Sequence, residues 1–346
     1  MSSILVLDDL LMAFGEDLKN EDVTEISVNK PEEYFIALKG TRDMVRKENP
    51  KLTYALLKDL AQNIATNSHQ EISNKKPLLS AQIESPDHEG LFYRIQIVHD
   101  PAVSTGSIAL SIRKPSILSL SYDQYEPILN SVEPFAKISA KDQELMDLYS
   151  ARNFHEFIRK AVQYEKNIII SAGTGSGKTT FFNSIISDCI PLGERLITIE
   201  DAKELRPPHP NTLQLYYSRG DQGLAKVTAQ SLMEACLRLY PKRILLGEIR
   251  GSEAFTYLNL ISSGHGGSIA TLHANDPVNA IERLTLMVLM AGTTLTSDQV
   301  KMFVNQSIDI IVQLGRTESG GYGCSSIYFK AYEDMKNEKN NLSNVA

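Results

Sequence analysis

Apolar and polar positions in the first third of the chain recur at two different spacings. Helical spacing marks the stretch from Leu5 to Leu18 and four later positions, Leu52, Leu56, Leu60 and Ile64. Short apolar runs bounded by polar residues predict four strands, Val23 to Val28, Tyr34 to Leu38, Leu91 to Val98 and Ser107 to Arg113. The pattern therefore predicts a small α+β unit over residues 1–114.

The second half of the chain shows a different pattern. A helical stretch from Ala140 to Gln163 is followed by five strand-like runs that are largely apolar: Asn167 to Ala172, Arg195 to Glu200, Arg243 to Glu248, Gly267 to His273 and Ile308 to Leu314. Runs that are buried on both faces are typical of a parallel sheet covered by helices. We therefore expect an α/β domain over residues 140–335.

Two further segments lack such patterns. Between the predicted domains, Pro115, Pro127 and Pro134 stand among scattered serines, which predicts a linker over residues 115–139. The last residues, 336–346, are rich in asparagine, lysine and serine, and we expect them to form a disordered tail.

Composition and charge narrow the class of protein. The 346 residues suffice for two cores, and 42% hydrophobic with 22% charged residues is ordinary for a soluble protein. The formal charge is −7 and no stretch gathers lysine and arginine, so we expect no strong nucleic-acid surface. The longest uncharged stretch, Ala254 to Asn275, contains glycines and histidines, which argues against a membrane span. Any membrane association should then be peripheral and made through partners.

The cysteines and the N-terminus indicate a location. Cys189, Cys236 and Cys324 are widely separated and form neither a C-x-x-C pair nor an even set, which favours a reducing cytoplasm and argues against zinc. The apolar N-terminal run includes Asp8 and Asp9 and has no basic leader, so a secretory signal is not expected.

The segment AGTGSGKTT, which begins at Ala172, carries the clearest chemistry. It follows an isoleucine-rich strand and precedes an amphipathic stretch, Phe181 to Ile190, which is the context a phosphate-binding loop requires and a chance glycine-rich hairpin lacks. The pattern G-x-x-x-x-G-K-[ST] has Ala172 in place of its first glycine, where we expect a small residue to fit. The predicted nucleotide-binding residues are Gly173, Thr174, Gly175, Ser176, Gly177, Lys178, Thr179 and Thr180.

Each part of this loop has a defined task. The glycines allow backbone N–H groups to converge on an oxyanion at the positive end of a helix. Lys178 supplies a charge for the β- and γ-phosphates, and Thr179 offers its hydroxyl to Mg²⁺. The loop thus predicts ATP and Mg²⁺ as ligands.

Hydrolysis also needs a carboxylate at the end of a neighbouring strand. In RILLGEIRGSEA, an Asp-Glu pair would commonly follow the apolar run, but Gly247 replaces the first acid and leaves Glu248 to orient or activate water. The alternative is a surface glutamate that simply pairs with Arg250.

A second acidic strand end lies in ITIEDAKEL. There Glu200 and Asp201 end an apolar run, and the carboxyl ends of strands in an open α/β sheet face the ligand. Glu200 is predicted to hold metal-bound water. The alternative is an acid pair that caps a helix over Ala202 to Leu205.

The segment GHGGSIATLHANDP contributes histidines. His273 ends a strand and is placed to donate a hydrogen bond to the γ-phosphate, although a structural histidine is equally consistent with the pattern. His265 lies in a glycine-rich turn, and its role is open. Asp276 and Pro277 predict the start of a helix over Ala280 to Met290.

In this order, the four segments resemble the Walker A, Asp box, glycine-containing Walker B and His box of the secretion ATPase superfamily of type II secretion, type IV pilus and type IV secretion motors. The resemblance covers about residues 150–330. The chain is most similar to the hexameric traffic ATPase of bacterial type IV secretion (conjugation) systems, because it is short, has a compact N-terminal half and lacks a four-cysteine zinc module. Pilus assembly and retraction ATPases are the nearest rivals.

The resemblance implies an architecture and a function. The fold would be a RecA-like P-loop NTPase domain preceded by a smaller, PAS-like α+β domain, with nucleotide between them. The protein would be a cytoplasmic, Mg²⁺-dependent homo-hexameric ATPase at the inner face of the inner membrane. It would associate with inner-membrane components of a secretion machine and drive translocation or pilus biogenesis.

The resemblance also assigns arginines. In FYRIQIV and LSIRKPS it implies that Arg94 and Arg113 reach the phosphates, whereas their residues alone suggest solvated strand arginines. Near LRLYPKRI, relatives carry a further arginine where this chain has Tyr240, so the roles of Arg238 and Arg243 are open. Arg250 is expected to face a neighbouring subunit.

Two alternatives from other classes remain at this point. A nucleic-acid translocase on the same core is disfavoured by the acidic charge. A nucleotide-binding scaffold would follow if Gly247 had ended catalysis.

Overall fold

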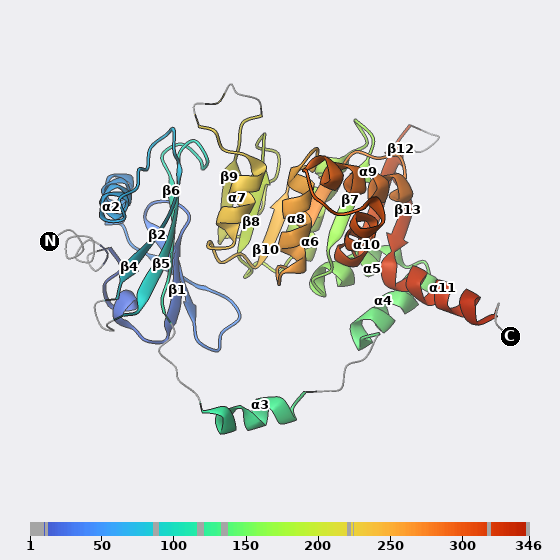
Figure 1. The fold of residues 1–346 in the computed structure, drawn as a ribbon, viewed down its shortest axis with the longest axis horizontal. Coiled ribbons are helices and arrows are strands. Elements are labelled where there is room, and N and C mark those ends of the chain that lie inside the picture. Colours follow the sequence, from blue (N-terminus) through green and yellow to red (C-terminus); the bar gives the residue numbers. More distant parts are fainter. Residues whose placement is uncertain are drawn as a thin grey trace.

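The computed structural model of the chain contains two β-sheets, each with its own helices (Figure 1). It describes residues 10, 13–85, 90–115, 121–132, 138–219, 223, 225–316 and 320–343, with the backbone alone for 338–343. Residues 13–19 are helical, which confirms the end of the helix predicted over Leu5 to Leu18. The rest of that helix apart from residue 10, residues 116–120 and 133–137 of the predicted linker, and residues 344–346 of the predicted tail lie outside the described residues.

The N-terminal sheet has six antiparallel strands in the order β3-β2-β1-β6-β5-β4. They are β1 (Val23–Val28), β2 (Glu33–Leu38), β3 (Val45–Glu48), β4 (Leu78–Glu84), β5 (Phe92–His99) and β6 (Ile108–Arg113). Helix α2 (Tyr54–Asn67) starts at the Thr53 cap and packs its apolar side on one face of this sheet. The four predicted strands and this helix are confirmed. Strands β3 and β4 were not predicted. Strand β3 has the sequence VRKE, and three of its four side chains face solvent at the sheet edge, so it lacks an apolar pattern.

The second sheet has seven strands in the order β13-β12-β7-β11-β10-β8-β9. They are β7 (Ile168–Ala172), β8 (Leu196–Glu200), β9 (Thr212–Tyr216), β10 (Arg243–Leu246), β11 (Ile269–Leu272), β12 (Ile310–Arg316) and β13 (Tyr322–Phe329). All five predicted strands are present. The expectation of a purely parallel sheet is wrong at one edge, because β13 pairs antiparallel with β12. Neither β13 nor β9 was predicted, since neither is continuously apolar.

Helices cover both faces of this sheet and form two cores. One core packs α7 (Ala229–Cys236), α8 (Glu253–Ser262), α9 (Pro277–Met290) and α10 (Ser297–Ser307) on the sheet. The other core packs α4 (Ala140–Ser150), α5 (Phe154–Gln163), α6 (Lys178–Cys189) and α11 (Lys330–Ser343). The single helix expected over Ala140 to Gln163 is broken at Arg152, which takes a left-handed backbone with φ 57°.

The joint between the two units is buried and combines apolar contacts, which include Val98 and Ala102 in the core of the second sheet, with polar ones. Arg195, at the start of β8, donates from Nη1 to Asn29 of the N-terminal unit at 2.8 Å and to Asn211 at 2.6 Å. The side chain of Asn29 also donates to Asn211 at 3.0 Å. Figure 1 shows the N-terminal sheet beside β9, and the N–H of Tyr216 at the end of β9 donates to the carbonyl of Ala102.

Segments outside the two sheets are more ordered than expected. The predicted linker includes a 3₁₀ helix, η1 (Tyr122–Tyr125), and α3 (Glu126–Asn130). Helix α11 spans Lys330–Ser343 and overlaps the predicted tail, whose disorder over residues 336–346 stays a prediction. The expected α/β fold preceded by a smaller α+β unit is confirmed, whereas the boundaries 1–114, 115–139 and 140–335 and the PAS-like description stay predictions.

Candidate active site

The loop between β7 and α6 has the geometry of an anion cradle. Gly175 and Gly177 adopt positive φ angles of 71° and 77°, which glycine allows without strain. Gly177 is the N-cap of α6 and provides no side chain to cap the helix, so a ligand oxygen can accept from the N–H groups of the first turn. The Ser176 hydroxyl donates to the carbonyl of Gly173 at 2.6 Å and stabilises the turn. Ala172 fits, because its methyl group is fully buried in the core.

Three side chains from three neighbouring strand ends converge beside this loop. Lys178 Nζ lies 3.5 Å from Oε2 of Glu248 and 3.3 Å from Nε2 of His273. His273 Nε2 is 3.4 Å from Oε1 of Glu248. Because β7, β11 and β10 are adjacent and parallel, their carboxyl ends bring together residues that are far apart in sequence.

His273 is oriented by the backbone. Its Nδ1–H donates to the carbonyl of Ala172 at 2.9 Å, which turns Nε2 toward Lys178 and Glu248. Nδ1 of the ring therefore has a structural role, whereas Nε2 faces the site. The structural interpretation of this histidine applies to Nδ1, and the phosphate-contacting interpretation applies to Nε2. The exposed fraction of its side chain is 34%, which leaves Nε2 open to a ligand.

Glu248 is charged and nearly buried. Burial alone would raise its pKa, but the hydrogen bond from Arg250 and the charges of Lys178 and His273 hold that pKa below its usual value. Burial lowers the pKa of Lys178, and the neighbouring Glu248 opposes this shift. The glutamate does pair with Arg250, as the simpler interpretation expects, yet it also faces the phosphate loop.

Glu200 lies behind this group. Its Oε1 accepts from the backbone N–H groups of Glu204 at 2.9 Å and Leu205 at 2.8 Å. Burial raises its pKa, partly offset by these hydrogen bonds. A Cβ atom added to Gly247 would lie 3.2 Å from Cγ of Glu200. The glycine, which stands where an acid is usual, therefore makes room for Glu200 on the neighbouring strand β8. The segment 202–205 is not helical, so Glu200 caps a loop and not a helix.

Oxygen atoms suited to Mg²⁺ line the cleft beside Lys178. Thr179 Oγ1 donates to Oε2 of Glu204 at 2.8 Å, and Glu200 and Asp201 line the same cleft. Among the described residues, no three His, Cys, Asp or Glu side chains form a preassembled metal site. This set fits Mg²⁺, which takes one or two protein oxygens together with substrate phosphates. Glu204 was missed, because a glutamate in a loop carries no pattern that marks it.

Arg250 contacts Glu248 and Asp201 of its own chain, and its expected contact with a neighbouring subunit stays a prediction. Its Nε is 2.6 Å from Oε1 of Glu248, its Nη2 donates to Oε2 at 2.7 Å, and its Nη1 donates to Asp201 at 3.1 Å. Arg219 Nε also lies 2.8 Å from Asp201.

The other candidate residues lie apart from this group. Arg94 and Arg113 are exposed partners on β5 and β6, and neither contacts the described phosphate loop. Arg243 is fully buried and pairs with Glu194, whereas Arg238 is exposed. The backbone carbonyl of His265 accepts from Ser268.

The hairpin of β12 and β13 contacts the loop from outside. A Cβ atom on Gly177 would lie 3.1 Å from the ring of Tyr322, and Arg316 Nη2 lies 3.5 Å from the carbonyl of Gly175. No pattern in the sequence joins Tyr322 to the phosphate loop, because the antiparallel return of β13 creates the contact.

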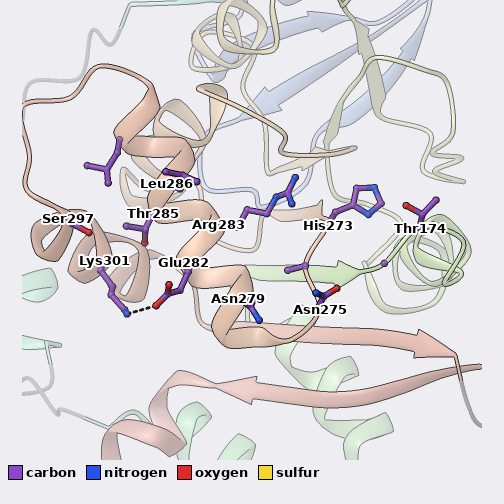
Figure 2. Close-up of a pocket in the computed structure, with 13 residues that line it drawn as sticks. Thr174, His273, Asn275, Asn279, Glu282, Arg283, Thr285, Leu286, Ser297 and Lys301 are labelled. Carbon is purple, nitrogen blue, oxygen red and sulfur yellow. Dashed lines mark hydrogen bonds and ion pairs between the residues drawn. The ribbon is translucent and has the colours of Figure 1, made fainter.

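A cavity of about 730 Å³ opens next to the loop (Figure 2). Thr174 and His273 lie at one end, and α9 and α10 form the opposite wall, where Lys301 pairs with Glu282 at 3.0 Å. The site thus has open space beside the phosphate cradle.

Comparisons with known proteins agree on one family. The model of the family described as type II/IV secretion system protein matches residues 137–328. The type IV secretion system protein VirB11 of Bartonella henselae is 38% identical over 332 residues, which cover 91% of this chain and 90% of the relative. The type IV secretion system protein PtlH of Bordetella pertussis is 36% identical over 321 residues, with 91% and 92% covered.

A solved structure is similar over the whole chain. The crystal structure of the VirB11 ATPase from the Brucella suis type IV secretion system, in complex with sulphate, has a TM-score of 0.85 and 34% identity. The match covers 96% of this chain and 99% of that chain. Within the described part of this chain, no helix has both the length and the apolarity to span a membrane. By sequence and by fold, this chain belongs to the type II/IV secretion system protein family.

Proposed function

We propose that this chain is a Mg²⁺-dependent ATPase that hydrolyses ATP to ADP and phosphate and drives substrate translocation or pilus biogenesis in a type IV secretion system. One observation carries the proposal. Lys178, Glu248 and His273 meet within 3.5 Å of one another beside a phosphate loop whose first-turn N–H groups are uncapped. These groups are the charge, the carboxylate and, in the imidazolium form of His273, the hydrogen-bond donor that phosphoryl transfer to water needs.

The residues divide the task as follows. The amides of residues 173–177 and Lys178 hold the β- and γ-phosphates, and Glu248 orients the attacking water. His273 Nε2 contacts the γ-phosphate. Mg²⁺, held by the Thr179 hydroxyl and through water by Glu200, would neutralise charge on the phosphate oxygens.

The arginines and the assembly complete the proposal. Arg94 and Arg113 act on the phosphates of a nucleotide held between the N-terminal and RecA-like domains in a homo-hexameric ring. The ring works in the cytoplasm at the inner face of the inner membrane, docked on inner-membrane components of the secretion machine. A six-subunit mass with ATP in native mass spectrometry supports this assembly, whereas a stable monomer under all nucleotide conditions contradicts it.

The activity is tested with Lys178→Ala, because this change removes the phosphate charge. We expect loss of turnover in a purified protein with an unchanged circular dichroism spectrum. Lys51→Ala, at an exposed position of the N-terminal unit, is the matched control and should keep full activity. Retained phosphate release by Lys178→Ala would overturn the assignment. Strong stimulation by single-stranded DNA with a steep salt dependence would instead favour a nucleic-acid translocase.

A further inference from the structure

Glu248 has both of its oxygens engaged by one guanidinium group. Arg250 approaches Oε1 through Nε at 2.6 Å and Oε2 through Nη2 at 2.7 Å. The carboxylate is 10% exposed and the guanidinium side chain 43% exposed, so the pair is shielded on the side of the glutamate. Oε1 is buried against the guanidinium without a hydrogen-bond partner, so the ion pair shuts this oxygen off from water. In this arrangement the ion pair with Arg250 keeps Glu248 from orienting the attacking water.

The same guanidinium has a second anchor. Arg250 Nη1 donates to Oδ2 of Asp201 at 3.1 Å, and Asp201 follows directly after β8. Arg219 reaches the same oxygen through Nε at 2.8 Å. Asp201 is 24% exposed and lines the same cleft as Lys178 and Glu248. Arg250 therefore contacts two carboxylates that compete for it. Glu248 is the one with the proposed task of orienting water, and Asp201 is the other.

We propose that Arg250 clamps Glu248 in the resting protein, and that Asp201 is the positioning residue that draws the guanidinium away so that Glu248 can orient water. This inference rests on the proposed role of Glu248. When phosphates occupy the loop, Lys178 turns to them and one of the charges that hold Glu248 in place is lost. The carboxylate of Asp201 then holds Arg250, so the guanidinium charge stays within the site.

The proposal predicts how changes at Asp201 act. Asp201→Asn removes the charge that competes for Arg250, so the guanidinium stays on Glu248. We expect kcat to fall by about fivefold to tenfold, with the dissociation constant for a fluorescent ATP analogue unchanged. Asp201→Glu keeps the carboxylate and should restore most of kcat. Glu71→Gln is the matched control, because it breaks an exposed ion pair of 2.7 Å in the N-terminal unit and should change neither quantity.

A double-mutant cycle separates this role from others. If Asp201 acts through Arg250, Asp201→Asn has no further effect in an Arg250→Gln background. If Asp201 instead holds Mg²⁺ or the fold, its replacement lowers kcat, or raises the Mg²⁺ concentration needed for half-maximal rate, in both backgrounds. Either of those results overturns the proposal, as does wild-type kcat in Asp201→Asn.

The outcome is distinguishable from failure of the proposed function. Glu248→Gln should abolish turnover if the glutamate orients water. If Glu248→Gln remains active, the role of Glu248 itself is wrong. If Glu248→Gln is inactive while Asp201→Asn behaves as the wild type, only the clamp is wrong.

Discussion

Lys178, the first residue of α6, forms an ion pair with Glu248, which follows β10. Their Nζ and Oε2 atoms are 3.5 Å apart, with side chains 12% and 10% exposed. The lysine that should hold phosphate thus already contacts the carboxylate that should handle water. We therefore expect phosphate binding to loosen the hold on Glu248, because one ammonium group would serve both anions.

His273 should contribute to the rate and not to the fold. His273→Asn keeps a short polar group near the carbonyl of Ala172 but leaves the Nε2 position empty. We expect kcat to fall by about 10- to 100-fold, because the contact of the imidazole ring with the developing charge is lost. Nucleotide affinity should change by less than about threefold, which titration with a fluorescent ATP analogue measures. A large loss of affinity with unchanged kcat would assign His273 to binding alone.

Gly177 should be irreplaceable for two separable reasons. Gly177→Ala forces a methyl group into a φ of +77° and to within 3.1 Å of the Tyr322 ring. Gly292→Ala meets a similar φ of +81° with no atom within 4 Å, so it isolates the backbone strain of roughly 1–2 kcal/mol. Both variants should lower the melting temperature, but only Gly177→Ala should lose the stabilisation that added ATP provides. Equal ATP stabilisation of both variants would contradict this account.

Glu25 should make stability depend on pH. Burial raises the pKa of Glu25 to about 7, although a hydrogen bond from Ser111 and the charges of Arg195 and Arg113 oppose the shift. The unfolded carboxyl titrates near 4.5, so the folded state holds a proton that the unfolded state releases. Stability from this group is complete below about pH 4.5 and is lost as pH rises through 7, by roughly 3 kcal/mol.

Glu25→Gln removes this dependence. Relative to the wild type, its free energy of unfolding should rise between pH 4.5 and 7 and then stay constant, as urea denaturation at several pH values can measure. A difference between the two proteins that does not change with pH would show that Glu25 ionises normally in the folded state.

Arg243 should be needed for the fold. It is fully buried, pairs with the buried Glu194, and donates from Nη1 to the carbonyl of Val162 at 2.7 Å. Arg243→Met leaves Glu194 without this charge, and we expect a loss of about 3–5 kcal/mol. Arg238→Met, at an exposed position five residues earlier, should stay within about 0.5 kcal/mol of the wild type in chemical denaturation. Equal effects of the two changes would refute the structural role of Arg243.

Much of the fold could be predicted because its signals are local. Continuous apolar runs mark β7, β8, β10, β11 and β12, which lie in the interior of the sheet and are covered on both sides. The missed strands β3, β4, β9 and β13 lie at sheet edges, where side chains face solvent and the pattern is weaker. Glu204 and Tyr322 could not be assigned to the site for a related reason: a loop and a hairpin place them there, and neither carries a spacing signal.

The sequence by itself determined that a phosphate loop, two acidic strand ends and a histidine follow one another in the order of one ATPase superfamily, because each depends on neighbours within a few residues. Tertiary structure decided which of these groups meet. It placed Lys178, His273 and Glu248 in contact, turned Arg250 onto Glu248, and buried Arg243 away from the site. Those outcomes depend on strand order and side-chain direction, which arise only when parallel strands align their carboxyl ends.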